Sequence, residues 1–257
     1  MIKLRHPEKT TLSIGDGAND VAMIMKADVG VGISGKEGMQ AAQASDFAIG
    51  QFRFLKPLLF LHGRECYRRN ADLVCYTFYK NMLYIVAQWW FGAFNHFSGQ
   101  NLYEAMIYQS FNIVFCGIPI MWFALFDWQH QKDDFLKKQN SSWYSIGIRN
   151  ERFDTKTFIK WVACGITEGL VIIFICFVSV EGIHAVNQSG RMWDFWSGGC
   201  NVYWVCIFVA NITCLRMLYT WTGWGEAIIA LCSFAYFPMI AMENRWSFTP
   251  EVYRSLS

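Results

Sequence analysis

The chain divides into a polar amino-terminal segment and a long apolar remainder. Beyond Leu73, mostly apolar stretches reach about 20 residues, the length that a helix needs to cross the hydrocarbon core of a bilayer. Five such stretches predict five transmembrane helices: Leu73–Phe94, Ala105–Phe126, Phe158–Val180, Val202–Trp221 and Trp224–Met242. The pattern therefore predicts a polytopic α-helical protein, integral to a membrane and crossing it several times.

The polar segment alternates short apolar stretches with turn residues. Thr11–Ile14 and Val29–Ile33 are typical of buried strands, and Val21–Lys26 between them is typical of a helix. A second helical stretch, Glu37–Ala44, precedes a short strand at Asp46–Ile49. Strands that alternate with helices predict part of a parallel α/β sheet, in which the chemistry lies at the carboxyl ends of the strands.

The composition agrees with a membrane protein. Of the 257 residues, 54% are hydrophobic and only 16% are charged. An average soluble domain carries roughly 25% charged residues, so the chain is short of polar surface. The formal net charge is only +2, so the whole chain does not favour an acidic partner. An ordinary soluble protein, a disordered chain and a nucleic-acid binder are excluded on these grounds.

Basic residues predict the orientation of the helices. The segment Trp128–Thr157 holds six Lys and Arg residues, Asn95–Glu104 holds none, and Glu181–Asn201 holds only Arg191. Because Lys and Arg are retained on the cytoplasmic side, Trp128–Thr157 and Met1–Asp72 are predicted to be cytosolic. The other two segments are then predicted to face outward.

The predicted organisation has four parts. Residues 1–55 form the end of a cytosolic α/β domain, 56–72 a cytosolic connector, 73–243 the transmembrane domain and 244–257 an exoplasmic tail. Three glycosylation sequons occur, at Asn140, Asn187 and Asn211. The sequon at Asn187 lies in a predicted outward loop, so glycosylation is expected there alone.

The sequence GDGAND, residues 15–20, directly follows the first predicted strand. Asp16 and Asp20 are four residues apart at a strand-to-helix turn, so both carboxylates can face one point. Carboxylate oxygens suit Mg²⁺, which usually keeps waters and phosphate oxygens as its other ligands. Asn19 can donate a hydrogen bond to a phosphoryl group or hold the turn. A plain surface turn is the alternative, and the preceding apolar strand favours metal-assisted phosphoryl transfer.

Polar residues within the predicted spans are candidates for a transport pathway. Placing the charge of Lys80 near mid-membrane in the first span costs at least ~2.5 kcal/mol of insertion free energy. This cost is avoided if the side chain extends to the cytoplasmic interface. Asn81 and Asn112 offer hydrogen bonds to a polar ligand or to another helix. Pro119 frees one backbone carbonyl, which either lines a pathway or marks a packing kink. Glu168 is a carboxylate well inside the third span, and the sequence assigns it no role.

Several motifs resemble one family. GDGANDVAMI resembles the last motif of the haloacid-dehalogenase-type phosphorylation domain in P-type ATPases. The continuation through VGVGISGKEGMQA and LHGRECYRR is similar to the flippases, the phospholipid-transporting (type IV) P-type ATPases. Phe78–Asn81 is similar to the family's FYKN in its fifth membrane helix. Phe111–Phe115, followed by Pro119, is similar to the family's pattern in its sixth.

The resemblance implies a place within a larger enzyme. In flippases ATP phosphorylates an aspartate in a DKTGT sequence, and these 257 residues contain no such sequence. The chain is therefore identified as a carboxyl-terminal fragment of a flippase, and the fragment alone is expected to be inactive. The family's activity is ATP-driven movement of phospholipid from the outer to the cytoplasmic leaflet.

The resemblance also implies cofactors, partners and site residues. Mg²⁺ and ATP are the expected cofactor and substrate, and the expected partner is a glycosylated accessory subunit with two spans. The expected location is the plasma membrane or a Golgi or endosomal membrane. The residues implied as metal ligands are Asp16 and Asp20, those near the phosphate are Asn19 and Asp20, and those of lipid transport are Lys80, Asn81, Asn112 and Pro119.

Three alternatives compete with this interpretation. A cation-pumping P-type ATPase needs carboxylates in its membrane site, and neither Leu73–Phe94 nor Ala105–Phe126 contains Asp or Glu. A soluble phosphatase of the same superfamily is excluded by the predicted spans. A truncated, non-catalytic membrane fragment, acting through assembly with other proteins, stays open.

Overall fold

The computed structural model describes residues 5–34, 39–130, 144–181 and 195–245. These residues belong to two compact units, each considered by itself. The first comprises the described residues of Met1–Arg64 and Gln131–Tyr144, and the second those of Glu65–His130 and Ser145–Ser257. The predicted glycosylation site at Asn187 and the predicted tail at 244–257 lie outside the described residues, apart from the last two positions of a helix.

The first unit contains a three-stranded parallel sheet. Strands β1 (Leu12–Gly15), β2 (Val29–Ile33) and β3 (Phe47–Ile49) pair side by side in that order. Helix α2 (Val21–Lys26) connects β1 to β2, and α3 (Gln40–Gln43) precedes β3. Ile24, Val31 and Ala41 form its buried apolar centre. The predicted parallel α/β arrangement is therefore confirmed in this segment.

Short helical turns complete the first unit. A 3₁₀ turn, η1 (Ala18–Asp20), leads into α2. After β3 the chain forms η2 (Phe52–Phe54), α4 (Leu55–Pro57) and a π-helical turn η3 (Leu58–Gly63). In the chain, η3 is followed directly by the long helix α5 (Arg64–Phe94).

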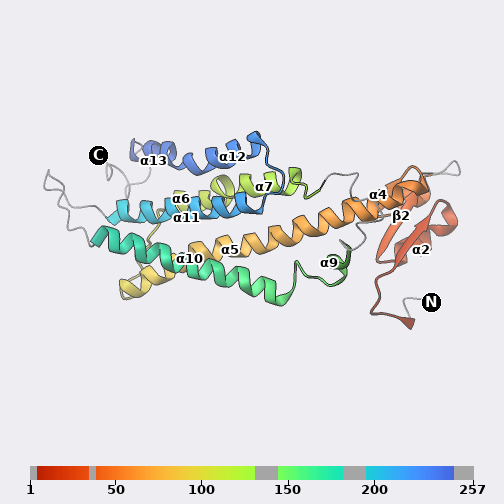
Figure 1. The fold of residues 1–257 in the computed structure, drawn as a ribbon, viewed down its shortest axis with the longest axis horizontal. Helices are drawn as coiled ribbons and strands as arrows, with labels where there is room; N and C mark the ends of the chain where they lie inside the picture. The colour runs from red at the N-terminus through yellow and green to blue at the C-terminus, as the bar shows by residue number, and fades with distance from the viewer. Residues whose placement is uncertain (1–4, 35–38, 131–143, 182–194, 246–257) are drawn as a thin grey trace. The chain divides into compact units, whose positions relative to one another are not determined.

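The regular elements of the second unit are all helices in its described residues (Figure 1). Helix α5 (Arg64–Phe94) is continuous over 31 residues. Two long helices follow further along the chain, α10 (Thr155–Glu181) and α11 (Phe195–Met217). The other elements are α6 (Ala105–Ser110), the π-helical turn η4 (Phe111–Phe115), α7 (Gly117–Phe126), α9 (Ser145–Ile148), α12 (Gly223–Phe234) and α13 (Tyr236–Arg245).

Four helical stretches in the described part of the chain are long and apolar enough to cross a membrane. They are Ala105–Phe126, Thr155–Cys176, Gly198–Met217 and Gly223–Met242. This is one fewer than predicted. The stretch Leu73–Phe94 is helical throughout, but Lys80, its amide residues and its many tyrosines and tryptophans lower its mean hydropathy. The structure thus supports a multi-pass membrane protein with four apolar spans.

Aromatic packing forms the centre of the second unit. The ring of Tyr84 in α5 stacks on Tyr103 at 4.5 Å and on Phe111 at 4.4 Å, measured between centroids. Tyr203 of α11 meets the same group edge-on, 5.7 Å from Tyr84. Stacked and edge-to-face aromatic pairs each add roughly 0.5–1.5 kcal/mol beyond simple burial. This cluster joins α5, the α6–η4–α7 span and α11.

Candidate functional site

The GDGAND turn presents two carboxylates at the carboxyl end of β1. Asp16 is exposed directly after the strand, and its backbone N–H donates to Asp20 Oδ2 at 3.2 Å. A Cβ atom at Gly15 would lie 2.3 Å from the Cβ of Asp20, so the turn requires glycine there. The two predicted metal ligands are thus neighbours, and Asn19 lies exposed between them in η1.

Two other carboxylates of the first unit have structural partners. Asp28, just before β2, accepts hydrogen bonds from the N–H and hydroxyl of Thr11 at 3.0 and 2.8 Å. Asp46, just before β3, accepts from the N–H of Gly30 at 2.8 Å. These carboxylates precede their strands, whereas Asp16 follows one. The difference in position leaves Asp16 facing solvent at the edge where parallel sheets hold their ligands.

Asp16 and Asp20 could supply some of the ligands of a Mg²⁺ ion but not all of them. Within the described residues no group of three or more His, Cys, Asp or Glu side chains converges on a point. Asp16 and Asp20 therefore supply at most two ligands. Mg²⁺ tolerates this, because it commonly keeps several waters and takes phosphate oxygens alongside one or two carboxylates.

Lys80 meets Asn112 in the second unit. Its ammonium nitrogen Nζ donates to Asn112 Oδ1 at 2.9 Å, although the two residues are 32 positions apart. Lys80 is only 5% exposed, whereas Asn112 lies on the exposed side of η4. The structure therefore brings together two of the four residues predicted for lipid transport. Asn81, the third, is half-buried beside Lys80 on α5.

Pro119, the fourth of these residues, has a different setting. It is buried in the first turn of α7, just after the π-helical turn η4. Proline has no N–H to offer the carbonyl four residues earlier. That carbonyl belongs to Phe115, and it accepts instead from Asn211 Nδ2 of α11 at 3.2 Å. Asn211 Nδ2 also donates to Ser233 of α12 at 2.9 Å, so the freed carbonyl takes part in a contact between helices.

Glu168 lies in a polar cluster that the sequence did not reveal. Its carboxylate accepts a hydrogen bond from the hydroxyl of Tyr79, the residue before Lys80. Thr213 of α11 lies 3.0 Å from the same hydroxyl, and Cys164 donates to Glu168 Oε1 at 3.3 Å. The cluster joins α5, α10 and α11. In the sequence, Glu168 stands out as a carboxylate in an apolar span. No sequence pattern identified its partner Tyr79, which lies 89 positions away.

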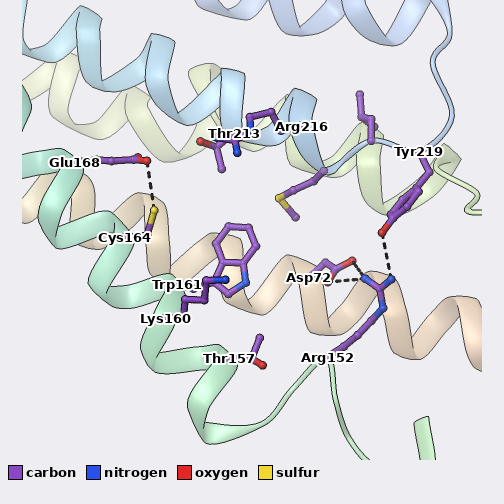
Figure 2. A pocket seen from close by; sticks show the side chains of 12 residues that line it. Asp72, Arg152, Thr157, Lys160, Trp161, Cys164, Glu168, Thr213, Arg216 and Tyr219 are labelled. Atoms are coloured by element: carbon purple, nitrogen blue, oxygen red, sulfur yellow. Dashed lines mark hydrogen bonds and ion pairs between the residues drawn. The ribbon is translucent and has the colours of Figure 1, made fainter. Parts of the chain in front are cut away.

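A cavity of about 570 Å³ opens beside this cluster (Figure 2). Helix α10 contributes Lys160, Trp161, Cys164 and Glu168 to its wall, and α11 contributes Thr213 and Arg216. Another part of the wall holds an ion pair, in which Arg152 Nη1 lies 3.0 Å from Asp72 Oδ2. Burial raises the pKa of the Asp72 carboxyl above its ordinary value, and Arg152 opposes this increase.

A buried ionic cluster fixes the beginning of α5 against the end of α7. Arg68 is 1% exposed and lies 2.9 Å from Glu65 Oε2 and 2.8 Å from Asp127 Oδ2. The second oxygen of Asp127 accepts from the backbone N–H groups of Tyr219 and Thr220, both at 2.9 Å. The Arg68 guanidinium also lies over the ring of Tyr219, at 5.2 Å. This cluster connects α5 to the ends of α7 and α11.

Comparison with known sequences decides the family. Residues 42–256 match the family described as phospholipid-translocating P-type ATPase C-terminal. The chain belongs to this family. The match covers all of the described helices of the second unit, so the helical unit is the family's carboxyl-terminal region.

Individual members of the family are similar over most of the chain. Phospholipid-transporting ATPase 6 of Arabidopsis thaliana is 35% identical over 95% of this chain, and phospholipid-transporting ATPase 10 of the same plant is 38% identical over 95%. Phospholipid-transporting ATPase DNF1 of Saccharomyces cerevisiae is 34% identical over 92%. The chain spans only 20%, 20% and 15% of the lengths of these relatives, respectively. The resemblance predicted from the motifs is confirmed at the level of the family.

Proposed function

We propose that this chain is the carboxyl-terminal part of an ATP-driven flippase, which moves phospholipid from the outer to the cytoplasmic leaflet. Membership of a family of phospholipid-translocating P-type ATPases supports the activity class. The observation that carries the proposal is the contact between Lys80 and Asn112, a cation and an amide held together within the helical unit. A lysine within the helical unit of a membrane protein carries a cost in free energy, so its position there indicates a functional role.

Lys80 and Asn112 form a polar point where a head group can bind. Because Asn112 lies on the exposed side of η4, a head group that binds there would bring a phosphate or carboxylate oxygen toward the buried Lys80 ammonium. In the proposed mechanism α5 also crosses the bilayer, with its polar side chains turned toward the other helices. A lipid head group that binds to both Lys80 and Asn112 then alters α5. The change is transmitted along this helix toward the cytosol and promotes dephosphorylation.

The GDGAND turn serves the phosphorylation half of the cycle. The first unit is proposed to be the end of a haloacid-dehalogenase-like phosphorylation domain, whose phosphorylated aspartate lies outside these 257 residues. Asp16 and Asp20 would hold Mg²⁺, which neutralises charge on the transferring phosphoryl group. Asn19 would donate a hydrogen bond to a phosphoryl oxygen. A glycosylated accessory subunit with two spans is the proposed partner, and the membrane is proposed to be the plasma membrane or a Golgi or endosomal one.

The decisive experiment uses a chimera in which this chain follows the amino-terminal part of a phospholipid-transporting relative. Phosphoenzyme is formed from ATP, and its decay is followed against added phosphatidylserine, phosphatidylethanolamine or phosphatidylcholine. Lys80→Ala, Lys80→Arg and Asn112→Ala should each raise the half-stimulating lipid concentration by roughly tenfold, because a hydrogen bond to a charged group is lost or misplaced. Phosphorylation itself should survive. Lys156→Ala, at an exposed position, is the control.

A lipid response that is unchanged in all three variants would remove Lys80 and Asn112 from the transport pathway. Asp16→Asn in the same chimera tests the other half, and should reduce phosphoenzyme formation at limiting Mg²⁺. Normal phosphoenzyme levels in Asp16→Asn would leave GDGAND as a structural turn.

The alternative function is that of a non-catalytic membrane fragment. The chimera distinguishes it, because a non-catalytic fragment would give the chimera no lipid-dependent decay of phosphoenzyme. The 257-residue chain alone, purified in detergent, tests the assignment of the domains. No vanadate-sensitive ATP hydrolysis is expected, because the chain contains no DKTGT sequence. Clear hydrolysis in a preparation free of contaminating ATPases would contradict the assignment of the domains.

A further inference from the structure

Tyr79 and Lys80 are consecutive residues of α5 with partners on different helices. Tyr79 is fully buried, donates its hydroxyl hydrogen to Glu168 of α10 and lies 3.0 Å from Thr213 of α11. Lys80 donates to Asn112 of η4. Consecutive side chains on an α-helix point about 100° apart. The rotation of α5 about its axis that allows the hydrogen bond from Tyr79 to Glu168 therefore also sets the direction in which the Lys80 side chain points.

Helix α10 is held unusually close to α5 at this level. A Cβ atom at Gly165 would lie 2.6 Å from the carbonyl oxygen of Tyr79, and one at Gly169 would lie 2.6 Å from that of Leu83. Glu168 comes from the turn between these two glycines. The ring of Trp161 also packs edge-on against Tyr79, at 5.8 Å between centroids. Backbone contact and the hydrogen bond to Glu168 thus act on the same turn of α5.

We propose that Glu168 is a positioning residue for Lys80 and acts through Tyr79. Its carboxylate fixes the Tyr79 hydroxyl, with Thr213 as the second partner of that hydroxyl, and so holds α5 in the rotation that directs Lys80 to Asn112. An apolar side chain at position 168 would fill the span at lower cost but would leave the Tyr79 hydroxyl with Thr213 of α11 as its partner and no tie to α10. The inference rests on the proposed function of Lys80 and adds α10 and α11 to the elements that control it.

The experiment uses the full chimera and the lipid that stimulates the unmodified chimera most strongly. Glu168→Leu and Tyr79→Phe should each raise the half-stimulating lipid concentration roughly threefold to tenfold, as expected for one lost buried hydrogen bond. The maximal rate of dephosphorylation at saturating lipid should change less. Glu168→Gln should restore a near-normal value, because the amide oxygen still accepts from Tyr79. Thr167→Val, at an exposed neighbouring position of α10, is the matched control.

Double variants show whether the effect passes through Lys80. In the Lys80→Ala background, Glu168→Leu should produce no further increase, because there is no longer an ammonium group to direct. A residue that merely holds the helices together would lower the yield of phosphoenzyme and the thermal stability in every background, and would leave the half-stimulating concentration unchanged. That pattern would overturn the proposal, as would an increase that adds to that of Lys80→Ala.

The outcomes separate this inference from the proposed function. If Lys80→Ala leaves the lipid response unchanged, the proposed function and this inference both fail. If Lys80→Ala shifts the response while Glu168→Leu and Tyr79→Phe do not, this inference alone fails. Should Glu168→Leu not accumulate in the membrane, Tyr79→Phe gives the same test, since it removes one hydroxyl and keeps the buried ring.

Discussion

At the scale of single residues, buried charge is the strongest local constraint on the helical unit. Arg68 holds two carboxylates, Glu65 and Asp127, in a place with almost no solvent contact. Two buried carboxylates around one guanidinium leave an excess of negative charge when the guanidinium is removed. The loss of one partner therefore costs more than the intact cluster contributes.

Arg68→Met should reduce the free energy of unfolding by about 3–5 kcal/mol, because it leaves uncompensated buried charge. Arg149→Met is the matched control, since Arg149 and Glu151 form an exposed pair at 3.5 Å. Such a pair is worth about 0–1 kcal/mol. Thermal unfolding in one detergent, followed by intrinsic fluorescence, measures both variants. Equal losses of stability would show that the Arg68 cluster is no stronger than a surface pair.

The raised pKa of Asp72 leads us to expect that the stability of the protein depends on pH. Burial raises the pKa of the Asp72 carboxyl in the folded state above its ordinary value, so the folded state binds the proton more tightly than the unfolded state. Stability relative to Asp72→Asn should therefore decline as the pH rises from about 4 toward the folded pKa. Unfolding of the two proteins between pH 4 and 7 tests this, with Glu151→Gln as the exposed control. A difference that moves in the opposite direction would contradict the sign.

At the scale of elements, close helix packing decides how the side chains meet. The sequence Gly165-Ile-Thr-Glu-Gly169 has glycines four residues apart, the spacing that allows helix backbones to approach within a membrane. The structure shows that the partner backbone is α5, at Tyr79 and Leu83. The hydrogen bond between Tyr79 and Glu168 depends on this approach, because longer separation would exceed the reach of the two side chains.

Gly165→Ala should destabilise the helical unit by roughly 1–3 kcal/mol, because its methyl group meets the Tyr79 carbonyl oxygen and forces the helices apart. Gly198→Ala in α11 is the control, since a Cβ atom there meets nothing within 4 Å. Alanine favours a helix over glycine by about 1 kcal/mol, so the control should be neutral or stabilising. Thermal midpoints in detergent measure the difference. Equal shifts in both variants would mean that α10 is not held closely against α5.

At the scale of the whole molecule, the distribution of Lys and Arg predicts the orientation in the bilayer. The segment between the second and third predicted spans contains six of these residues, and the segment between the first and second contains none. Retention of basic segments on the cytoplasmic side predicts that the two segments lie on opposite faces of the membrane.

Cysteine labelling tests this topology. With the exposed Cys66 and Cys164 replaced by serine, Gln100→Cys should react with an impermeant maleimide added outside intact cells. Gly147→Cys should react only after the membrane is permeabilised. Both positions are exposed in the structure, so access of the reagent depends on the side of the membrane. Labelling of Gly147→Cys in intact cells would reverse the predicted orientation.

The sequence by itself determined the family, the parallel strands and four of the five predicted apolar spans. Each of these depends on local pattern: alternation along a strand, about 20 apolar residues in a row, or a motif such as GDGAND. The residues Lys80 and Asn112 were both predicted as sites for the same reason, since a polar side chain in an apolar stretch stands out. Their contact was not predicted, because hydrophobic pattern carries no information on which helix faces which.

Only the tertiary structure decided the pairings. The Glu168 carboxylate accepts a hydrogen bond from Tyr79. The Phe115 carbonyl, which has no helical donor because residue 119 is proline, accepts one from Asn211. Lys80 and the aromatic residues made α5 less apolar than the other spans, so counting apolar residues overestimated the number of such spans by one. Polar groups within a helical unit are satisfied by residues far away in sequence, because apolar surroundings offer no water as a substitute. Long-range hydrogen bonds of this kind are fixed only when the helices pack.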